Sequence, residues 1–446
     1  MFSFGVSRKM SSADSICLHD VGRVSMMRSI PCELRVNSRL RVEIGVITEF
    51  FGARLEELDV QGCVWKTHWE EADSFNNSHG VLENANATLT QTPQSSSSSS
   101  SSTSSSTSSS STSSLSLYLK APSREGHFHL HVSCTPPSST SHFTVYRKLQ
   151  RENNQYNFLV LPLITEKVKI KGVCEQHLQK YPTLRCYRDV PLYDTFSGED
   201  TGETTISSNL STNTLYVRIQ EEYGAQIGSH LWDSSIILTR YLHFSTWLNV
   251  TTKTLLGATG LTAIELGAGL GLCGIYLAKF ARTIFKRVVI TDTVSLIGHI
   301  ETNVHLNNCE KNAETASIDF TTDWNMIETS VGQFNHGFSL VLAADVMYDD
   351  VVTELFLRTV QKLILLGNAI YGDDGQFNQC TQFIVAQKAR GEKDRNYFEK
   401  LIEGSSLTPP SSISDGGLRK FSFVPEHLHT EASVHVWSLK LQLQDI

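Results

Sequence analysis

The chain has 446 residues, 40% of them hydrophobic, which is enough for two domains and a large core. A formal net charge of −8 gives no overall attraction to nucleic acid, although a local basic patch remains compatible with it. No apolar run approaches the ~18 residues of a membrane span and no secretion signal is evident, so we expect a soluble intracellular protein, nuclear, cytoplasmic or both.

The first 200 residues predict a poorly defined, β-rich N-terminal region. Short alternating or apolar runs predict strands at residues 39–51, 116–120, 127–134, 142–147 and 157–164. A Ser/Thr linker over residues 91–115 interrupts the region, and residues 95–114 are all serine or threonine. Such a tract buries too little apolar surface to offset its conformational entropy, so we expect it to be disordered. Residues 193–213 predict a second linker.

From residue 215 to residue 446, strands and helices alternate, which predicts one domain. Strands are expected at residues 216–220, 262–266, 288–291, 316–320, 339–344 and 382–386, and helices at 234–242, 271–284, 294–307, 351–366 and 393–403. Alternation of this kind predicts an α/β fold with a Rossmann-like parallel sheet covered on both faces. Two last strands, 418–424 and 434–441, have no helix between them, so we expect an antiparallel hairpin at one edge.

A glycine-rich turn is the most informative feature of this domain. Residues 261–271 read LTAIELGAGLG, an apolar strand that ends in Gly267, Gly269 and Gly271 before a helix. Glycine accepts positive φ and lets a ligand approach the backbone, and the first amides of the helix face that ligand. Ligands of open α/β sheets bind at the carboxyl ends of the strands. The turn therefore predicts a nucleotide-type cofactor site.

The acid at the end of the next strand helps to choose the cofactor. Asp292 lies 23 residues after Gly269, a spacing suited to binding ribose hydroxyls. Gly269, Gly271 and Gly274 also match the dinucleotide pattern G-x-G-x-x-G, which allows NAD, but this leaves Glu265 and Gly267 unexplained. We therefore favour S-adenosylmethionine; a glycine-rich turn that only packs a helix on a strand is the alternative.

Two further strand ends carry polar and aromatic residues. They read Asp323-Trp324 and Ala344-Asp345-Val-Met-Tyr348. Together with the Glu265–Gly271 turn and Asp292, these segments resemble the seven-strand class I methyltransferases. More narrowly, they resemble the methyltransferase-like lysine methyltransferases, methyltransferase family 16, which also carry a Gly-x-x-x-Trp segment like Gly228–Trp232. The resemblance spans residues 215–446 and does not extend to residues 1–200.

This resemblance implies an enzyme that methylates lysine side chains of a protein substrate. We also expect a monomer with no nucleic-acid or membrane partner. The residues that would bind S-adenosylmethionine are Trp232, Gly267, Ala268, Gly269, Asp292, Trp324 and Ala344. Asp345 and Tyr348 form the family's Asp-x-x-Tyr signature and would lie beside the transferred methyl group as the catalytic residues.

The chemistry of methyl transfer suggests what Asp345 and Tyr348 would do. An attacking lysine must be neutral, which costs about 4 kcal/mol at pH ~7.4 for a free pKa of ~10.4. The sulfonium charge and a dry pocket lower that pKa, whereas an ionised Asp345 raises it, so we interpret Asp345 as orienting the amine. Tyr348 would supply an aromatic wall. The group that removes the proton stays open, and solvent is one candidate.

Other acceptors and other classes of protein remain as alternatives. The acceptor could be arginine, a small molecule or nucleic acid, but the segment after Asp345 lacks the two prolines typical of methyltransferases that act on base amino groups. A non-catalytic interaction protein with the same fold is a different class of answer. A nicotinamide-dependent oxidoreductase is the last.

Two clusters outside these motifs have simpler explanations. On a strand, His127, His129 and His131 would share one face, which could bind zinc but is more typical of a half-exposed strand. None of the nine cysteines forms a Cys-x-x-Cys pair, so we predict no metal site and no disulfide framework. Lys388, Arg390, Lys393 and Arg395 form a basic cluster that we interpret as a solvated loop, with docking of an acidic substrate segment as the alternative.

Overall fold

The structure is a computed structural model of the chain. It describes residues 20–26, 33–35, 37–47, 64–72, 82–84, 88–89, 115–135, 158–171, 185–192, 215–222, 226–245, 261–334, 338–366, 369–371, 377–379, 381–390 and 419–445. Three predictions lie outside these residues: the strand at 142–147, the helix at 393–403 and the second linker. Of the Ser/Thr linker, only residue 115 is described.

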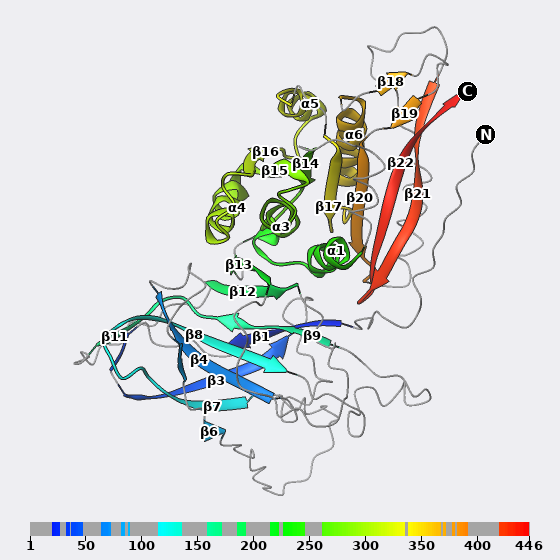
Figure 1. The fold of residues 1–446 in the computed structure, drawn as a ribbon. Coiled ribbons are helices and arrows are strands. Elements are labelled where there is room, and N and C mark those ends of the chain that lie inside the picture. The colour runs from blue at the N-terminus through cyan, green and yellow to red at the C-terminus, as the bar shows by residue number, and fades with distance from the viewer. Residues whose placement is uncertain are drawn as a thin grey trace, which may run out of the picture.

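A seven-stranded sheet organises the C-terminal half, in the order β16-β15-β14-β17-β20-β22-β21 (Figure 1). Its strands are β14 (Leu261–Leu266), β15 (Phe285–Asp292), β16 (Ala313–Ser317), β17 (Leu340–Ala344), β20 (Gln382–Lys388), β21 (Arg419–Glu431) and β22 (Val434–Asp445). The first five are parallel, and β22 runs antiparallel to both β20 and β21. This confirms the predicted α/β sheet and its antiparallel edge hairpin.

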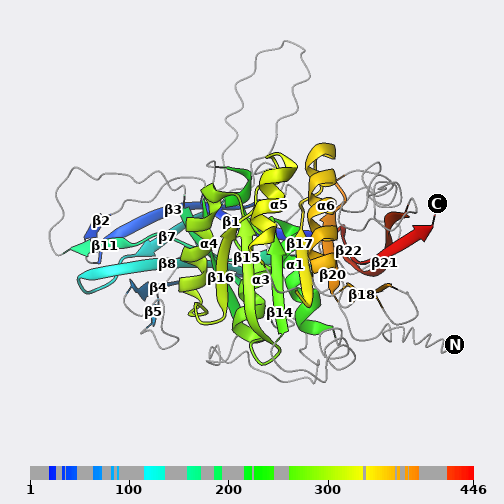
Figure 2. The same cartoon turned by 90° about the horizontal axis from the view of Figure 1, so that it is seen from above.

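Helices cover both faces of this sheet (Figure 2). They are α1 (Asp233–Phe244), α3 (Leu272–Phe280), α4 (Val294–Leu306), α5 (Trp324–Gly332) and α6 (Asp350–Leu366). Alternate residues of β17 belong to two different cores: Leu340 and Leu342 pack with α1, α3 and α4, whereas Val341 and Ala343 pack with α5 and α6. Such a two-sided strand explains the continuous apolar run in its sequence. None of the helices within the described ranges is long and apolar enough to cross a membrane.

Several elements differ from the prediction. The third strand covers Ala313–Ser317, three residues earlier than expected, and the helix after the glycine turn ends at Phe280 instead of residue 284. Helix α5 was not predicted, although its start is marked: the side chain of Asp323 accepts a hydrogen bond from Met326 N at 3.1 Å, as an N-cap residue does.

The N-terminal half is built from strands, as expected. Its strands are β1 (Asp20–Met26), β2 (Glu33–Arg35), β3 (Arg39–Ile47), β4 (Val64–Glu71), β5 (Leu82–Asn84), β6 (Thr88–Leu89), β7 (Leu115–Lys120), β8 (Gly126–Thr135), β9 (Phe158–Leu161), β10 (Leu163–Ile164), β11 (Val168–Lys171), β12 (Arg185–Pro191) and β13 (Tyr216–Glu222). They form a five-stranded and an eight-stranded sheet. Strand β13, which the sequence placed in the C-terminal domain, pairs with β12 in the larger of these two sheets.

Side chains of α4 bind the backbone of β13 and so link the two halves. Asn303 Oδ1 accepts from Gln220 N at 2.7 Å, and Asn307 Oδ1 accepts from Arg218 N at 3.1 Å. In return, Asn307 Nδ2 donates to Arg218 O at 2.6 Å. Both asparagines are buried. Their amides satisfy backbone groups of the strand that would otherwise need a neighbouring strand.

Candidate active site

The glycine turn after β14 has the backbone conformation that the sequence predicted. Gly267, Gly269 and Gly271 have φ of +59°, +57° and +81°, a region that residues with a Cβ rarely adopt. Gly271 is the residue directly before α3. The amide of Ala268 donates to Thr291 O at 2.9 Å, which fixes the turn against the end of β15.

Two other segments touch this turn so closely that side chains on its glycines would collide with them. A Cβ on Gly267 would lie 2.5 Å from Cγ1 of Val346, between Asp345 and Tyr348 in the sequence. A Cβ on Gly269 would lie 3.0 Å from the carbonyl oxygen of Gly228. The structure therefore brings the glycine turn, the Gly228–Trp232 segment and the Asp345–Tyr348 segment together at the carboxyl edge of the sheet.

Asp292 lies directly against the turn. Its Oδ2 accepts from Gly269 N at 2.7 Å, and its Oδ1 accepts from Thr293 N at 2.7 Å. The residue is only 9% exposed, and burial raises the pKa of its carboxyl above the ordinary value, while the amide donors act in the opposite direction. A carboxylate with two positioned oxygens beside glycine backbone fits the hydroxyls of a ribose.

Glu265 explains the third glycine of the dinucleotide-like pattern. Its buried Oε2 accepts from Gly274 N at 2.7 Å, and burial raises the pKa of Glu265 to about 7. A Cβ on Gly274 would lie 2.8 Å from this oxygen and 2.6 Å from Cγ1 of Ile290. Close packing of α3 on the sheet thus requires a glycine at residue 274, and no dinucleotide is needed to explain it.

Trp232, a predicted pocket residue, is the N-cap residue of α1, and its side chain makes no capping hydrogen bond there. Its Nε1 donates to Ile227 O at 3.1 Å, in the short helix η2 (Ile227–Ser229). The ring of His230 meets the Trp232 ring edge-on, with centroids 4.9 Å apart. The next residue, Asp233, is buried and forms an ion pair with Lys388 at the end of β20. These contacts fix the indole beside the carboxyl ends of the strands.

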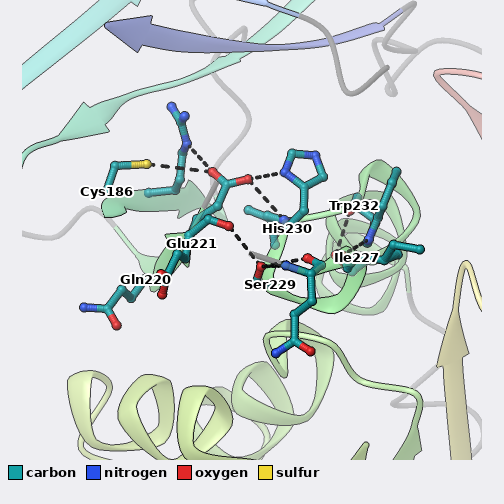
Figure 3. Close-up of polar contacts among 12 residues, drawn as sticks. Cys186, Gln220, Glu221, Ile227, Ser229, His230 and Trp232 are labelled. Carbon is teal, nitrogen blue, oxygen red and sulfur yellow. Dashed lines mark hydrogen bonds and ion pairs between the residues drawn. The ribbon is translucent and has the colours of Figure 1, made fainter. Parts of the chain in front are cut away.

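A buried carboxylate, Glu221, holds the Gly228–Trp232 segment from the side of β13 (Figure 3). Its Oε1 pairs with His230 Nδ1 at 2.5 Å and accepts from Leu231 N at 3.2 Å. Its Oε2 accepts from Arg188 Nε at 2.9 Å, and both of these charged side chains are 0% exposed. The sequence analysis missed Glu221, because nothing in a strand of mixed polarity distinguishes a buried acid from a solvated one.

The same carboxylate contacts Cys186 on β12. The thiol Sγ lies 3.9 Å from Glu221 Oε2, and burial raises the pKa of Cys186 to about 12. This thiol is therefore a neutral, unreactive neighbour of the ion pair. Glu221 links β12 of the N-terminal sheet to the segment that carries Trp232.

Asp345 follows β17 in a conformation that is unusual for a residue with a side chain. Its φ is +60°, and its amide donates to Ala386 O at 2.9 Å. Asp345 Oδ1 accepts from Gln387 Nε2 and from Arg390 Nη1, each at 3.0 Å, and Oδ2 accepts from Arg390 Nη2. The carboxylate side chain is only 4% exposed. A strained, nearly buried acid at a strand end is typical of a functional position.

Tyr348 is 62% exposed, more open than a wall of a dry pocket would be. Partial burial raises the pKa of Tyr348 above its ordinary value, and the charge of Asp292 contributes in the same direction. Tyr348 therefore lies close enough to Asp292, the candidate for ribose binding, for the charge of that carboxylate to affect it.

The remaining candidates occupy less decisive positions. Trp324 is the first residue of α5 and packs, partly buried, on the core of the α5–α6 face. Ala344 is the last residue of β17 and packs, partly buried, on the opposite core. Roles for Trp324 and Ala344 in cofactor binding stay predictions.

The histidines of β8 do not present a common open face. His129 is fully buried and its Nδ1 lies 2.7 Å from Thr165 O, whereas the Nε2 of His131 pairs with Glu70 Oε2 at 2.6 Å. His127 is exposed. Across the part of the chain that the structure describes, no three His, Cys, Asp or Glu side chains are grouped to hold a metal ion.

The sheet order, the glycine turn after its first strand and the acid after its second define a class I methyltransferase fold. Comparison with known proteins gives the family. Residues 211–404 match the family model described as lysine methyltransferase, and this part of the chain is a lysine methyltransferase domain.

Curated relatives share this domain at modest identity. Protein N-lysine methyltransferase METTL21A of Mus musculus is 25% identical over 238 residues, which are 53% of this chain and 87% of that protein. Methyltransferase-like protein 22 of Homo sapiens is 30% identical over 150 residues, 31% of this chain and 34% of that protein. The sequence of residues 343–350 and 385–390 also resembles this relative. Protein-lysine N-methyltransferase EFM2 of Saccharomyces cerevisiae is 23% identical over 192 residues, 41% of this chain and 42% of that protein.

Among solved structures, the comparison finds an O-methyltransferase from Bacillus cereus in complex with SAH. The match covers 46% of this chain and 89% of that chain, with 10% sequence identity and a TM-score of 0.26.

Proposed function

We propose that this chain transfers the methyl group of S-adenosylmethionine to the side chain of a lysine in another protein. The observation that carries the proposal is the meeting of three segments within a lysine methyltransferase domain. The glycine turn contacts both the Gly228–Trp232 segment and the Asp345–Tyr348 segment, and Asp292 is bonded to the same turn.

Residues on the cofactor side have defined tasks in this proposal. The backbone of Gly267–Gly269 would lie against the cofactor, in the positive-φ conformation that glycine accepts. Asp292 would accept hydrogen bonds from the ribose hydroxyls. When bound, S-adenosylmethionine supplies a methyl group activated by the positive sulfonium, which the acceptor amine attacks in line. Trp232 would border the pocket from the start of α1.

Residues on the acceptor side would align the amine. Asp345 is held by Gln387 and Arg390, so its carboxylate can accept a hydrogen bond from the amine only in a fixed direction. Alignment of this kind raises the rate mainly because less entropy is lost on the way to the transition state. Tyr348, which is exposed to solvent, would cover the apolar stem of the incoming lysine. Solvent is the proton acceptor that this arrangement leaves available.

A labelling experiment tests the proposed reaction. The purified full chain is incubated with S-adenosylmethionine labelled in its methyl group and an extract of cells that lack the gene. We expect label in protein, resistant to nuclease and removed by protease, and methyl-lysine after acid hydrolysis. Label in nucleic acid, in methyl-arginine or in small molecules would show that the acceptor is not lysine. The cofactor alone is also titrated into the protein in a calorimeter. Absence of a heat of binding would contradict catalysis.

A further inference from the structure

Arg390 joins the two sides of the candidate active site. It lies two residues beyond the end of β20, and its side chain is 23% exposed. Its two terminal nitrogens bind the two carboxylate oxygens of Asp345, which is the two-pronged geometry preferred between guanidinium and carboxylate. Its Cζ lies 5.2 Å from the ring centroid of Trp232. One guanidinium therefore fixes both a candidate catalytic acid and a candidate pocket wall.

This pairing resolves an electrostatic conflict in the proposed reaction. A lone carboxylate beside the acceptor lysine favours the ammonium form, which cannot attack the methyl group. Asp345 is almost fully buried, so water screens its charge poorly. A guanidinium stays protonated at any pH the protein survives. Asp345 and Arg390 together thus present a neutral unit that keeps an oriented oxygen without the full field of an anion.

We propose that Arg390 is a positioning residue of the methyltransferase, which neutralises Asp345 so that the acceptor lysine can enter the reaction uncharged. The inference rests on the proposed function and adds a residue to it. Arg390 acts through Asp345 and Trp232 and need not touch the methyl group. The basic cluster after β20 therefore contains at least one residue with a task inside the site, beyond a solvated loop or a docking surface.

The other charges around this unit do not substitute for Arg390. Lys388 also lies at the end of β20, but its Nζ is paired with Asp233 of α1. Tyr348 lies within the field of three acidic side chains, Asp292, Asp349 and Asp319. Loss of the guanidinium would therefore leave the acceptor lysine among uncompensated acids.

The test is the pH dependence of methyl transfer by full-length variants. Arg390→Gln and Arg390→Met remove the charge, the second with a side chain that still packs on Trp232. Arg390→Lys keeps the charge without the two-pronged geometry. Arg287→Gln is the matched control, because Arg287 also binds a carboxylate with two nitrogens, Glu314 at 2.9 and 2.8 Å, on the exposed surface at β15 and β16. Initial rates are measured with saturating labelled cofactor and a fixed amount of extract from cells that lack the gene.

We expect both uncharged variants to move the midpoint of the pH–rate curve upward by on the order of one pH unit. At neutral pH their rate should therefore be roughly tenfold lower. Arg390→Lys should keep a midpoint near that of the unsubstituted chain, and so should Arg287→Gln. Circular dichroism and thermal unfolding identify any variant that fails to fold. The test needs only one of the two uncharged variants to fold.

Two results would overturn the inference while leaving the proposed function intact: uncharged variants whose midpoint equals that of Arg287→Gln, or an equal upward shift in Arg390→Lys. Absence of transfer by the unsubstituted chain would instead contradict the proposed function.

Discussion

The amide of Gly269 donates to Oδ2 of Asp292 at 2.7 Å, so the glycine turn and the acid after the next strand hold each other in place. The interaction connects two residues that the sequence analysis selected for separate reasons, backbone freedom and carboxylate chemistry. Because the acid is fixed by backbone amides, its orientation does not depend on a ligand. Several of the following predictions use this preorganised edge of the sheet.

Replacement of Asp292 by Ala should weaken the binding of S-adenosylmethionine by roughly 10–150-fold, because charge-assisted hydrogen bonds contribute about 1.5–3 kcal/mol. Isothermal titration calorimetry measures the change, with Glu314→Ala on the exposed surface of β16 as control. The pKa of Asp292 is raised, so affinity should also decline as the pH falls through that raised value. Unchanged affinity in Asp292→Ala would remove this residue from the cofactor site.

Asp345→Asn should reduce methyl transfer at least ~100-fold, the scale expected when a reacting group loses its alignment, and leave cofactor affinity within about tenfold. Asn is preferred to Ala here because φ is +60°, and Asn tolerates this region better. Single-turnover rates and calorimetry separate the two effects. Turnover that survives the substitution would exclude Asp345 from the reaction.

The turn itself can be tested with two glycines of opposite character. Gly267→Ala should destabilise the protein by more than about 1–2 kcal/mol, because a positive φ is costly for Ala and Val346 occupies the space of its Cβ. Gly298→Ala lies in α4 with no atom within 4 Å of the new Cβ, so it should stabilise by about 0.4–1 kcal/mol. Urea unfolding measures both, and equal effects would contradict the strained turn.

Glu221→Gln should destabilise by about 3–5 kcal/mol, because it breaks a fully buried ion pair with Arg188. Glu222→Gln is the matched control: its partner Arg185 is exposed, and loss of such a pair costs about 0–1 kcal/mol. Cofactor affinity should fall only in Glu221→Gln, since Glu221 also holds His230 and the backbone of Leu231. Equal costs for the two substitutions would show that the buried network is dispensable.

Acid should destabilise the N-terminal sheets through two buried histidines. Burial lowers the pKa of both His68 and His129 from 6.5 to about 4. The unfolded chain therefore binds protons at these histidines over a pH range in which the folded chain does not. The free energy of unfolding should then decrease as the pH is lowered from about 6.5 to about 4.

His129→Asn tests this pH effect and can keep a hydrogen bond to Thr165 O. It should reduce the slope of stability against pH by at most one proton, about 1.4 kcal/mol per pH unit. Thr302→Ser, at an exposed position of α4 that does not titrate, should leave the slope unchanged. Urea midpoints at several pH values provide the measurement, and parallel curves for the two variants would exclude His129 as a cause.

Local patterns predicted most of the C-terminal sheet, because its signals lie within single elements. The apolar run of β17 and the glycines after β14 each determine a structure through neighbouring residues. Contacts between distant residues could not be predicted in this way. Glu221 and Arg188 are 33 residues apart, and Arg390 and Asp345 are 45 apart, so their pairing depends on how the strands are ordered. The candidate site was therefore predicted as a set of strand ends, whereas the interactions that hold those ends became visible only in three dimensions.

Strand β13 has a practical consequence for anyone who isolates the catalytic half. The family match begins at residue 211, so a fragment cut there keeps β13 but removes β12, its hydrogen-bonded neighbour. Such a fragment would expose a bare strand edge that invites aggregation, and Glu221 would lose the guanidinium of Arg188. The boundary drawn by homology is therefore a poor place for truncation, and expression trials should retain the strands that precede it.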